Sequence, residues 1–203
     1  MLNVVLVEPE IPANTGNIGR TCVLAGARLH LVGPLGFELT DQAVQRAGLA
    51  YWQSLDLRTY PTWEIFVERH PIVMDALAGD TTGSVERSPI HFLTKAGART
   101  YADSTYADGD WLVFGKESAG LDARLLEAHP TLCERIPMRG DNALGNARSW
   151  HEGFDSSHPQ LERDICGNYV DRRAGQITSL NLSNAVAIVL FEALRQTGFP
   201  ELA

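Results

Sequence analysis

The chain has 203 residues, of which 44% are hydrophobic and 21% charged, close to the usage of ordinary globular proteins. This length suits one domain with a sizeable core, and no apolar run approaches the roughly 20 residues that span a bilayer, so we expect no membrane association. Seventeen Lys and Arg against 25 Asp and Glu give a net charge of −8, so binding of nucleic acid would require locally concentrated arginines or a basic surface shared with a second subunit.

The first half of the chain predicts strands alternating with helices. Residues 2–7 form a continuous apolar run, typical of a strand buried on both faces, and Glu8 follows too early for a signal peptide. A turn-rich stretch leads to a helix from about Asn17 to Ala25, with Gly26 as its C′ residue. The further predicted elements are the strand Leu29–Val32, a short helix Asp41–Ala47, a helix capped by Thr62 that runs to Arg69, and the strand Ile72–Leu77.

The second half continues the alternation until one long segment interrupts it. Its predicted strands are Ile90–Thr94, Trp111–Phe114 and Cys133–Met138, and its predicted helices are Leu121–Ala128 and Ser183–Thr197. This order indicates an α/β fold with a mostly parallel sheet and helices on both faces. Arg139–Thr178 contains five glycines and no sustained periodicity. We therefore predict a single domain, residues 1–203, with an irregular inserted segment at about 139–178.

The cysteines and histidines give little support for a disulfide framework or a metal site. Cys22, Cys133 and Cys166 are odd in number and widely spaced, which favours a reducing, cytoplasmic environment. His151, His158 and Cys166 raise the possibility of zinc, but their spacing matches none of the usual paired ligand patterns. We therefore expect no metal.

Two polar segments follow predicted strands, where open α/β sheets bind their ligands. In Pro12–Arg20, Asn14 suits a tight turn and Arg20 would lie on the first turn of the next helix, where its guanidinium can meet a phosphate or ribose. Taken alone, a capped turn followed by a surface arginine explains this segment better. In Phe114–Leu121, Gly115 permits close backbone approach and Glu117 supplies a carboxylate, but such strand–Gly–Glu–Gly–helix junctions are frequent.

A third segment, Ser179–Asn184, opens the last helix. Ser and Asn are good N-caps, but four polar side chains in six residues exceed what capping requires. Together with Arg135–Met138, the three segments resemble, in this order, the ribose 2′-O-methyltransferase branch of the SPOUT superfamily. The likeness is greatest to its small subfamily that methylates the wobble nucleotide of tRNA, and it covers nearly the whole chain apart from about Ala78–Pro89 and Arg139–Thr178.

The resemblance implies an activity, a fold and a site. The activity is transfer of a methyl group from S-adenosylmethionine to a ribose 2′-hydroxyl of tRNA, at the wobble nucleotide of the anticodon. Ribosomal RNA as the substrate, or a relative that binds RNA without catalysis, remain alternatives. The implied fold has a C-terminal trefoil knot, which periodicity could not have suggested because true knots are nearly absent from proteins. The implied donor-binding residues are Leu93, Gly115, Ile136, Met138, Ser179 and Leu180, and the implied catalytic residues are Arg20, Glu117 and Asn181. We add Asn14 to the catalytic residues.

Two physical arguments refine these roles. The pKa of arginine, above about 12, is poorly matched to a general base at neutral pH, so we assign Arg20 a positioning role on phosphate or the developing alkoxide. Asn14, Glu117 and Asn181 would then order the surrounding loops. The helix Ser183–Thr197 is apolar over much of its circumference, which predicts, as the resemblance also implies, a homodimer.

Overall fold

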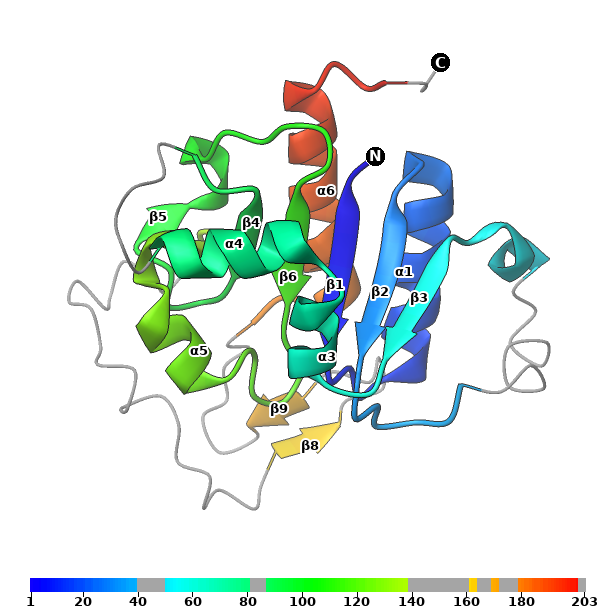
Figure 1. The fold of residues 1–203 in the computed structure, drawn as a ribbon. Helices are drawn as coiled ribbons and strands as arrows, with labels where there is room; N and C mark the ends of the chain where they lie inside the picture. Colours follow the sequence, from blue (N-terminus) through cyan, green and yellow to red (C-terminus); the bar gives the residue numbers. More distant parts are fainter. Residues whose placement is uncertain (40–49, 81–86, 139–160, 164–168, 172–178, 201–203) are drawn as a thin grey trace.

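A computed structural model describes residues 1–39, 50–80, 87–138, 161–163, 169–171 and 179–200 (Figure 1). Its centre is a seven-stranded sheet in the order β3-β2-β1-β6-β4-β7-β5, in which every pair of neighbours is parallel. The strands are β1 (Asn3–Val7), β2 (Arg28–Val32), β3 (Leu57–Tyr60), β4 (Ile90–Leu93), β5 (Arg99–Thr100), β6 (Trp111–Phe114) and β7 (Cys133–Arg135).

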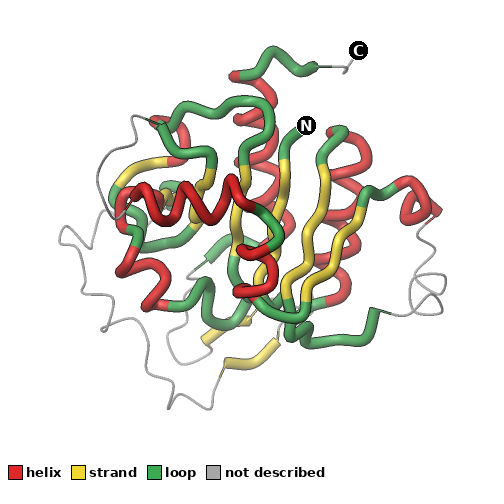
Figure 2. Tube along the Cα trace, in the orientation of Figure 1, coloured by secondary structure: helices red, strands yellow, loops and turns green. Residues whose placement is uncertain are grey.

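Helices cover both faces of this sheet, as predicted (Figures 1 and 2). On one face lie α1 (Pro12–Ala25) and α6 (Leu182–Gln196), and on the other lie α3 (Trp63–Glu68), α4 (Pro71–Asp80) and α5 (Ala123–Ala128). Three short 3₁₀ helices complete the described helices: η1 (Ala50–Ser54), η2 (Tyr101–Asp103) and η3 (Pro130–Leu132). None of the described helices has the length and apolar character needed to cross a bilayer.

Alternation along β1 assigns its residues to two cores. Val4 and Leu6 pack in the cluster under α1 and α6, whereas Val5 packs in the cluster under α3, α4 and α5. All three side chains are fully buried. A strand covered on both faces has no position at which a polar side chain could stay solvated. This explains the continuous apolar run from which the strand was predicted.

The predicted strand Ile72–Leu77 is wrong, because this segment forms helix α4. Pro71 occupies the first helical position, where its missing N–H costs nothing, and the carbonyl of His70 accepts from Val73 N and Met74 N. Val73 and Ala76 are buried while Ile72 and Met74 are exposed. Buried residues three positions apart are typical of a helix. Apolar residues on the exposed face made the segment a continuous apolar run, which led to the prediction of a strand.

Helix α1 begins at Pro12, earlier than the predicted Asn17. It ends at Gly26, whose φ of 62° confirms the predicted C′ position. The turn-forming residues Pro12 and Asn14 suggested a loop, but proline is well tolerated in the first turn of a helix. Arg20 consequently lies in the middle of α1 and not on its first turn, which corrects its predicted position.

Other predictions have mixed outcomes. Thr62 caps α3 through Ile65 N, as predicted. Strand β3 was missed because Arg58 and Thr59 are exposed on this edge strand, so no apolar run marks it. Strand β7 ends at Arg135, short of the predicted Met138. The predicted helix Asp41–Ala47 lies outside the described residues.

The predicted irregular segment is described only at β8 (Leu161–Arg163) and β9 (Tyr169–Asp171). These two strands pair antiparallel with each other, so part of this segment is regular. His151, His158 and Cys166, weighed as zinc ligands, lie outside the described residues. Among the described residues, no three His, Cys, Asp or Glu side chains are grouped so that they could hold a metal ion.

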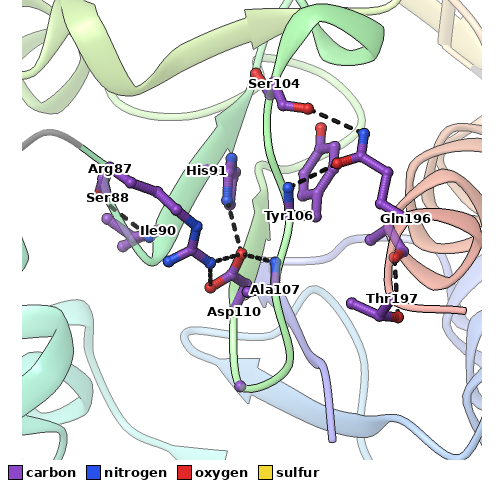
Figure 3. Close-up of polar contacts among 12 residues, drawn as sticks. Arg87, Ser88, Ile90, His91, Ser104, Tyr106, Ala107, Asp110, Gln196 and Thr197 are labelled. Carbon is purple, nitrogen blue, oxygen red and sulfur yellow. Dashed lines mark hydrogen bonds and ion pairs between the residues drawn. The ribbon is translucent and has the colours of Figure 1, made fainter. Parts of the chain in front are cut away.

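A buried ionic network joins the strands β4, β6 and β7, and Figure 3 shows its contacts around Asp110. Asp110, just before β6, accepts from Arg87, from Ala107 N and from His91 Nε2, and His91 Nδ1 lies 2.7 Å from Glu134 Oε1. Burial opposes protonation of His91, but hydrogen bonds to Asp110 and Glu134 outweigh it and raise its pKa. The network therefore joins these strands through a histidine whose two ring nitrogens both face buried carboxylates.

A second buried chain of polar groups links β1, β2 and β3. Asn3 Nδ2 donates to Gly109 O, so Asn3 Oδ1 faces His30 Nε2 at 3.2 Å, and that nitrogen carries the proton. His30 Nδ1 then accepts from the Tyr60 hydroxyl at 3.0 Å, and that hydroxyl accepts from His70 Nε2 at 2.9 Å. The chain is satisfied when His30 is neutral.

We predict that His30 makes the protein less stable in acid. Burial, reinforced by the charge of His70, lowers the pKa of His30 from 6.5 to about 3. Its contribution is fully present above pH 6.5 and is lost as the pH falls from there toward about 3, because the unfolded chain binds the proton first. The free energy of unfolding, measured with urea at pH 7 and near pH 4.5, should fall between these two pH values by about 2 kcal/mol less in His30→Gln than in the wild type. Equal differences in the two proteins would contradict this assignment.

Candidate functional site

The polar segments lie at the carboxyl edge of the sheet, where its strand order reverses. After β1, the next two strands, β2 and β3, are added on one side of β1, whereas β6 and the remaining strands lie on its other side. Leu6 pairs with Phe114, and Phe114 pairs with Leu93, so β1, β6 and β4 end side by side. Open α/β sheets bind ligands in the crevice at such a switch point.

Hydrogen bonds join all three polar segments. Asn14 Nδ2 donates to Glu117 Oε1 at 2.9 Å, and Asn14 Oδ1 accepts from Asn181 Nδ2 at 2.9 Å. Asn181 Oδ1 in turn accepts from the amide and the hydroxyl of Ser183. Asn14 is 2% exposed, so its amide is committed to this junction. We call Asn14, Glu117 and Asn181 the three-segment junction.

Further contacts tie the loop after β1 to the loop after β6. The second oxygen of Glu117 accepts from Glu10 N at 2.8 Å, and Glu10 accepts from the amide and hydroxyl of Ser118 at 2.9 and 3.0 Å. Lys116 Nζ donates to Glu8 at 2.8 Å. Sequence reasoning missed Glu8, Glu10 and Ser118, because nothing in their spacing shows that the two loops meet.

These contacts define what the carboxylates can do. Glu117 accepts from two donors and Glu10 from two donors of Ser118, so their oxygens serve to hold the loops. The junction is therefore suited to holding the backbone of these loops in place around a substrate.

Gly115 turns the chain tightly after β6. A Cβ added there would lie 2.0 Å from the carbonyl carbon of Gly120, and Gly120 itself has a φ of 75°. Lys116 and Gly120 form an isolated antiparallel bridge that closes this loop. Only glycine fits at position 115, as expected where backbone must approach closely.

The predicted donor-binding residues come from neighbouring elements. Leu93 and Ile136 are partly buried against the same core cluster as α6. Met138 and Ser179 are also partly buried, and Leu180 is 38% exposed. The partial burial of these side chains leaves part of their surface open to solvent.

The loop after β4, which follows Leu93, is held against β7. Thr94 N donates to Glu134 O at 2.8 Å, and Arg135 Nη1 donates to the carbonyls of Gly97 and Ala98 at 2.9 and 3.0 Å. Gly97 permits this approach, since a Cβ there would lie 2.4 Å from the carbonyl carbon of Glu134. The loop is thereby fixed beside Leu93 and Ile136.

Arg20 is not part of the three-segment junction. Because 3.6 residues make one turn, Arg20 and Asn14 do not share a face of α1, and Arg20 is exposed. Its Cζ lies 5.1 Å from the centroid of the Tyr51 ring. Tyr51 was missed by sequence reasoning, because it lies in a short 3₁₀ helix that no motif marks.

Known proteins resemble this chain along its whole length. Residues 1–147 match the SpoU rRNA Methylase family. A protein of Burkholderia cenocepacia named tRNA (cytidine(34)-2′-O)-methyltransferase is 38% identical over 200 residues, which cover 98% of this chain and 97% of that one.

Two solved structures share the fold at similar identity. One, described as a candidate RNA methyltransferase from Bacillus anthracis, has a TM-score of 0.72 and 33% identity, covering 100% of this chain and 98% of that chain. Another, described as giving insights into the 2-OH methylation of C/U34 on tRNA, has a TM-score of 0.66 and 32% identity, covering 97% and 95%. The extent of the family match and the identity to full-length relatives lead to one conclusion: the chain belongs to the SpoU methylase family.

Proposed function

We propose that this protein transfers a methyl group from S-adenosylmethionine to the 2′-hydroxyl of the wobble ribose of tRNA. The observation that carries the proposal is the three-segment junction, in which Glu117 and Asn181 both bond Asn14 across more than 100 residues of sequence. The relatives named for this activity at cytidine 34 match the chain from end to end and support it.

The proposed donor site uses Leu93, Gly115, Ile136, Met138, Ser179 and Leu180. S-adenosylmethionine, when bound, supplies a methyl group already activated by the sulfonium, so the reaction needs no metal. The new O–C bond forms as the C–S bond breaks, and the hydroxyl proton leaves to solvent or to a phosphate of the RNA. In-line attack depends on orientation, which can remove much of the barrier.

In this scheme Arg20 binds phosphate or the developing alkoxide of the RNA. A guanidinium is positively charged and presents several donors in one plane. Asn14, Glu117 and Asn181 fix the loops between which donor and ribose meet.

The function is tested by methylation with radiolabelled donor of tRNA transcripts that carry cytidine or uridine at position 34. A transcript with a single 2′-deoxynucleotide at that position should accept no label, since only the attacking hydroxyl is missing. S-adenosylhomocysteine should raise the melting temperature through binding to the folded state, whereas NAD should not. Label in ribosomal RNA instead would identify ribosomal RNA as the substrate. Donor binding without methylation of any RNA would identify the protein as a non-catalytic relative.

We further propose a homodimer. Leu24 of α1 and Ile188 and Phe191 of α6 are 69%, 37% and 45% exposed, on two helices that pack side by side. Exposed apolar residues on adjoining helices favour an interface, and two subunits would give a chain of net charge −8 a composite surface for RNA. Light scattering at micromolar concentration should give twice the monomer mass, and Phe191→Glu should halve it.

The remaining proposals concern fold and location. We infer that residues 1–203 form one domain whose C-terminal segment passes through a trefoil knot, as the resemblance to the SPOUT superfamily implies. A crystal structure traced continuously from β7 to α6 checks this. The thiol of Cys22 is buried and forms no disulfide with the described residues, which supports action in the cytoplasm, a location that cell fractionation tests.

A further inference from the structure

The aromatic residue beneath Arg20 is held by contacts of its own. Tyr51, in η1, donates its hydroxyl to Gly16 O at 2.5 Å. In an α-helix that same carbonyl accepts from the amide four residues later, which is the backbone of Arg20. The phenol and the backbone of Arg20 are thus fixed to one oxygen atom, and the guanidinium of Arg20 lies over the ring.

Small residues of α1 allow η1 to come this close. A Cβ on Gly19 would lie 3.2 Å from Trp52 Cζ3 and 3.2 Å from Leu55 Cδ2, closer than carbon atoms normally pack. Glycine at this position therefore lets the side chains of Trp52 and Leu55 rest directly on the helix, which keeps η1 close to Arg20.

The ionisation state of Tyr51 suits this arrangement. Burial raises the pKa of its phenol, while the charge of Arg20 and a hydrogen bond from it act in the opposite direction. The phenol stays protonated at neutral pH and remains a donor to Gly16 O. The ring presents its negative face to the guanidinium, which leaves donors at the guanidinium edge for an anion.

We propose that Tyr51 is a positioning residue for Arg20, orienting its guanidinium toward the phosphate or developing alkoxide of the RNA. This inference rests on the role of Arg20 in the proposed function. An unsupported exposed arginine samples many rotamers, so a fixed ring and a fixed backbone carbonyl restrict it before RNA arrives.

The experiment compares two substitutions of Tyr51 in the full-length protein under single-turnover methylation of tRNA. Tyr51→Leu removes the ring and should lower the methylation rate at saturating tRNA about tenfold, with the affinity for S-adenosylhomocysteine unchanged. Tyr51→Phe keeps the ring but loses the hydroxyl, with its bond to Gly16 O and the hydrogen bond from Arg20, so it should recover part of that rate through the ring alone. Gln53→Ala, a change at an exposed residue of the same 3₁₀ helix, is the matched control and should leave the rate near that of the wild type.

The coupling to Arg20 is measured in the Arg20→Lys background. There Tyr51→Leu should change the residual rate less than twofold, because the planar group that the ring supports is already gone. A tenfold loss in both backgrounds, or lost S-adenosylhomocysteine binding in both Tyr51 variants, would overturn the inference. A wild-type rate in Tyr51→Leu alongside an inactive Arg20→Ala would also overturn it, whereas full activity of Arg20→Ala would instead refute the proposed function of Arg20.

Discussion

Arg20→Ala should lower the rate of tRNA methylation about 10²–10³-fold, the size of effect seen when a donor to a developing negative charge is removed. Arg20 is exposed and makes no contribution to the three-segment junction, so the affinity for S-adenosylhomocysteine and the melting temperature should stay near those of the wild type. Single-turnover methylation and isothermal titration measure the two quantities separately.

Arg20→Lys separates charge from geometry. Lysine keeps the positive charge but cannot present a planar fork of donors, so it should recover only a few per cent of the rate, about a tenfold gain over alanine. Arg124→Lys is a matched control, because Arg124 is exposed on α5, which covers the opposite face of the sheet. Substantial activity in Arg20→Lys would reduce Arg20 to a generic charge.

The three-segment junction predicts a second large effect, in which two harmful substitutions correct each other. Asn14→Asp places a carboxylate where Asn14 Nδ2 lies, 2.9 Å from Glu117 Oε1, so two negative oxygens would meet. Glu117→Gln can still accept from Glu10 N, but its new amide nitrogen then faces the donor Nδ2 of Asn14. Flipping the Asn14 amide would only move the mismatch to Asn181 Nδ2.

Each single substitution should therefore lower the melting temperature by about 5 °C, since one unmet buried polar pair costs about 1–3 kcal/mol. Each should also lower methylation at least tenfold by loosening the loops around donor and ribose. In the double variant the new glutamine amide donates to the new aspartate carboxylate. The glutamine still accepts from Glu10 N and the aspartate still accepts from Asn181, so all three hydrogen bonds return with one direction reversed.

The double variant should recover most of the melting temperature and much of the rate. Glu68→Gln, an exposed residue of α3, is the control for loss of a negative charge and should change neither. Additive losses in the double variant would show that the junction does not hold the three segments together in solution.

Local sequence patterns determined much of this fold. The apolar runs of β1, β4 and β6 marked strands buried on both faces, since a parallel sheet covered by helices leaves no position for a solvated side chain. Gly26 and Thr62 marked the end of α1 and the start of α3, because caps depend on the conformation and hydrogen bonds of one residue. The order of the polar segments was sufficient to indicate the family to which the chain belongs.

Only the tertiary structure decided where those segments meet. Helix α4 is a helix because one of its faces is buried, although its exposed Ile72 and Met74 gave it the appearance of a strand. Asn14 lies inside α1 because Glu117 and Asn181 engage its amide, and Arg20 lies over Tyr51 because η1 packs on the helix. Such contacts join residues far apart in sequence, and hydrogen bonds and ring contacts at that range leave no periodicity or spacing by which a single sequence could reveal them.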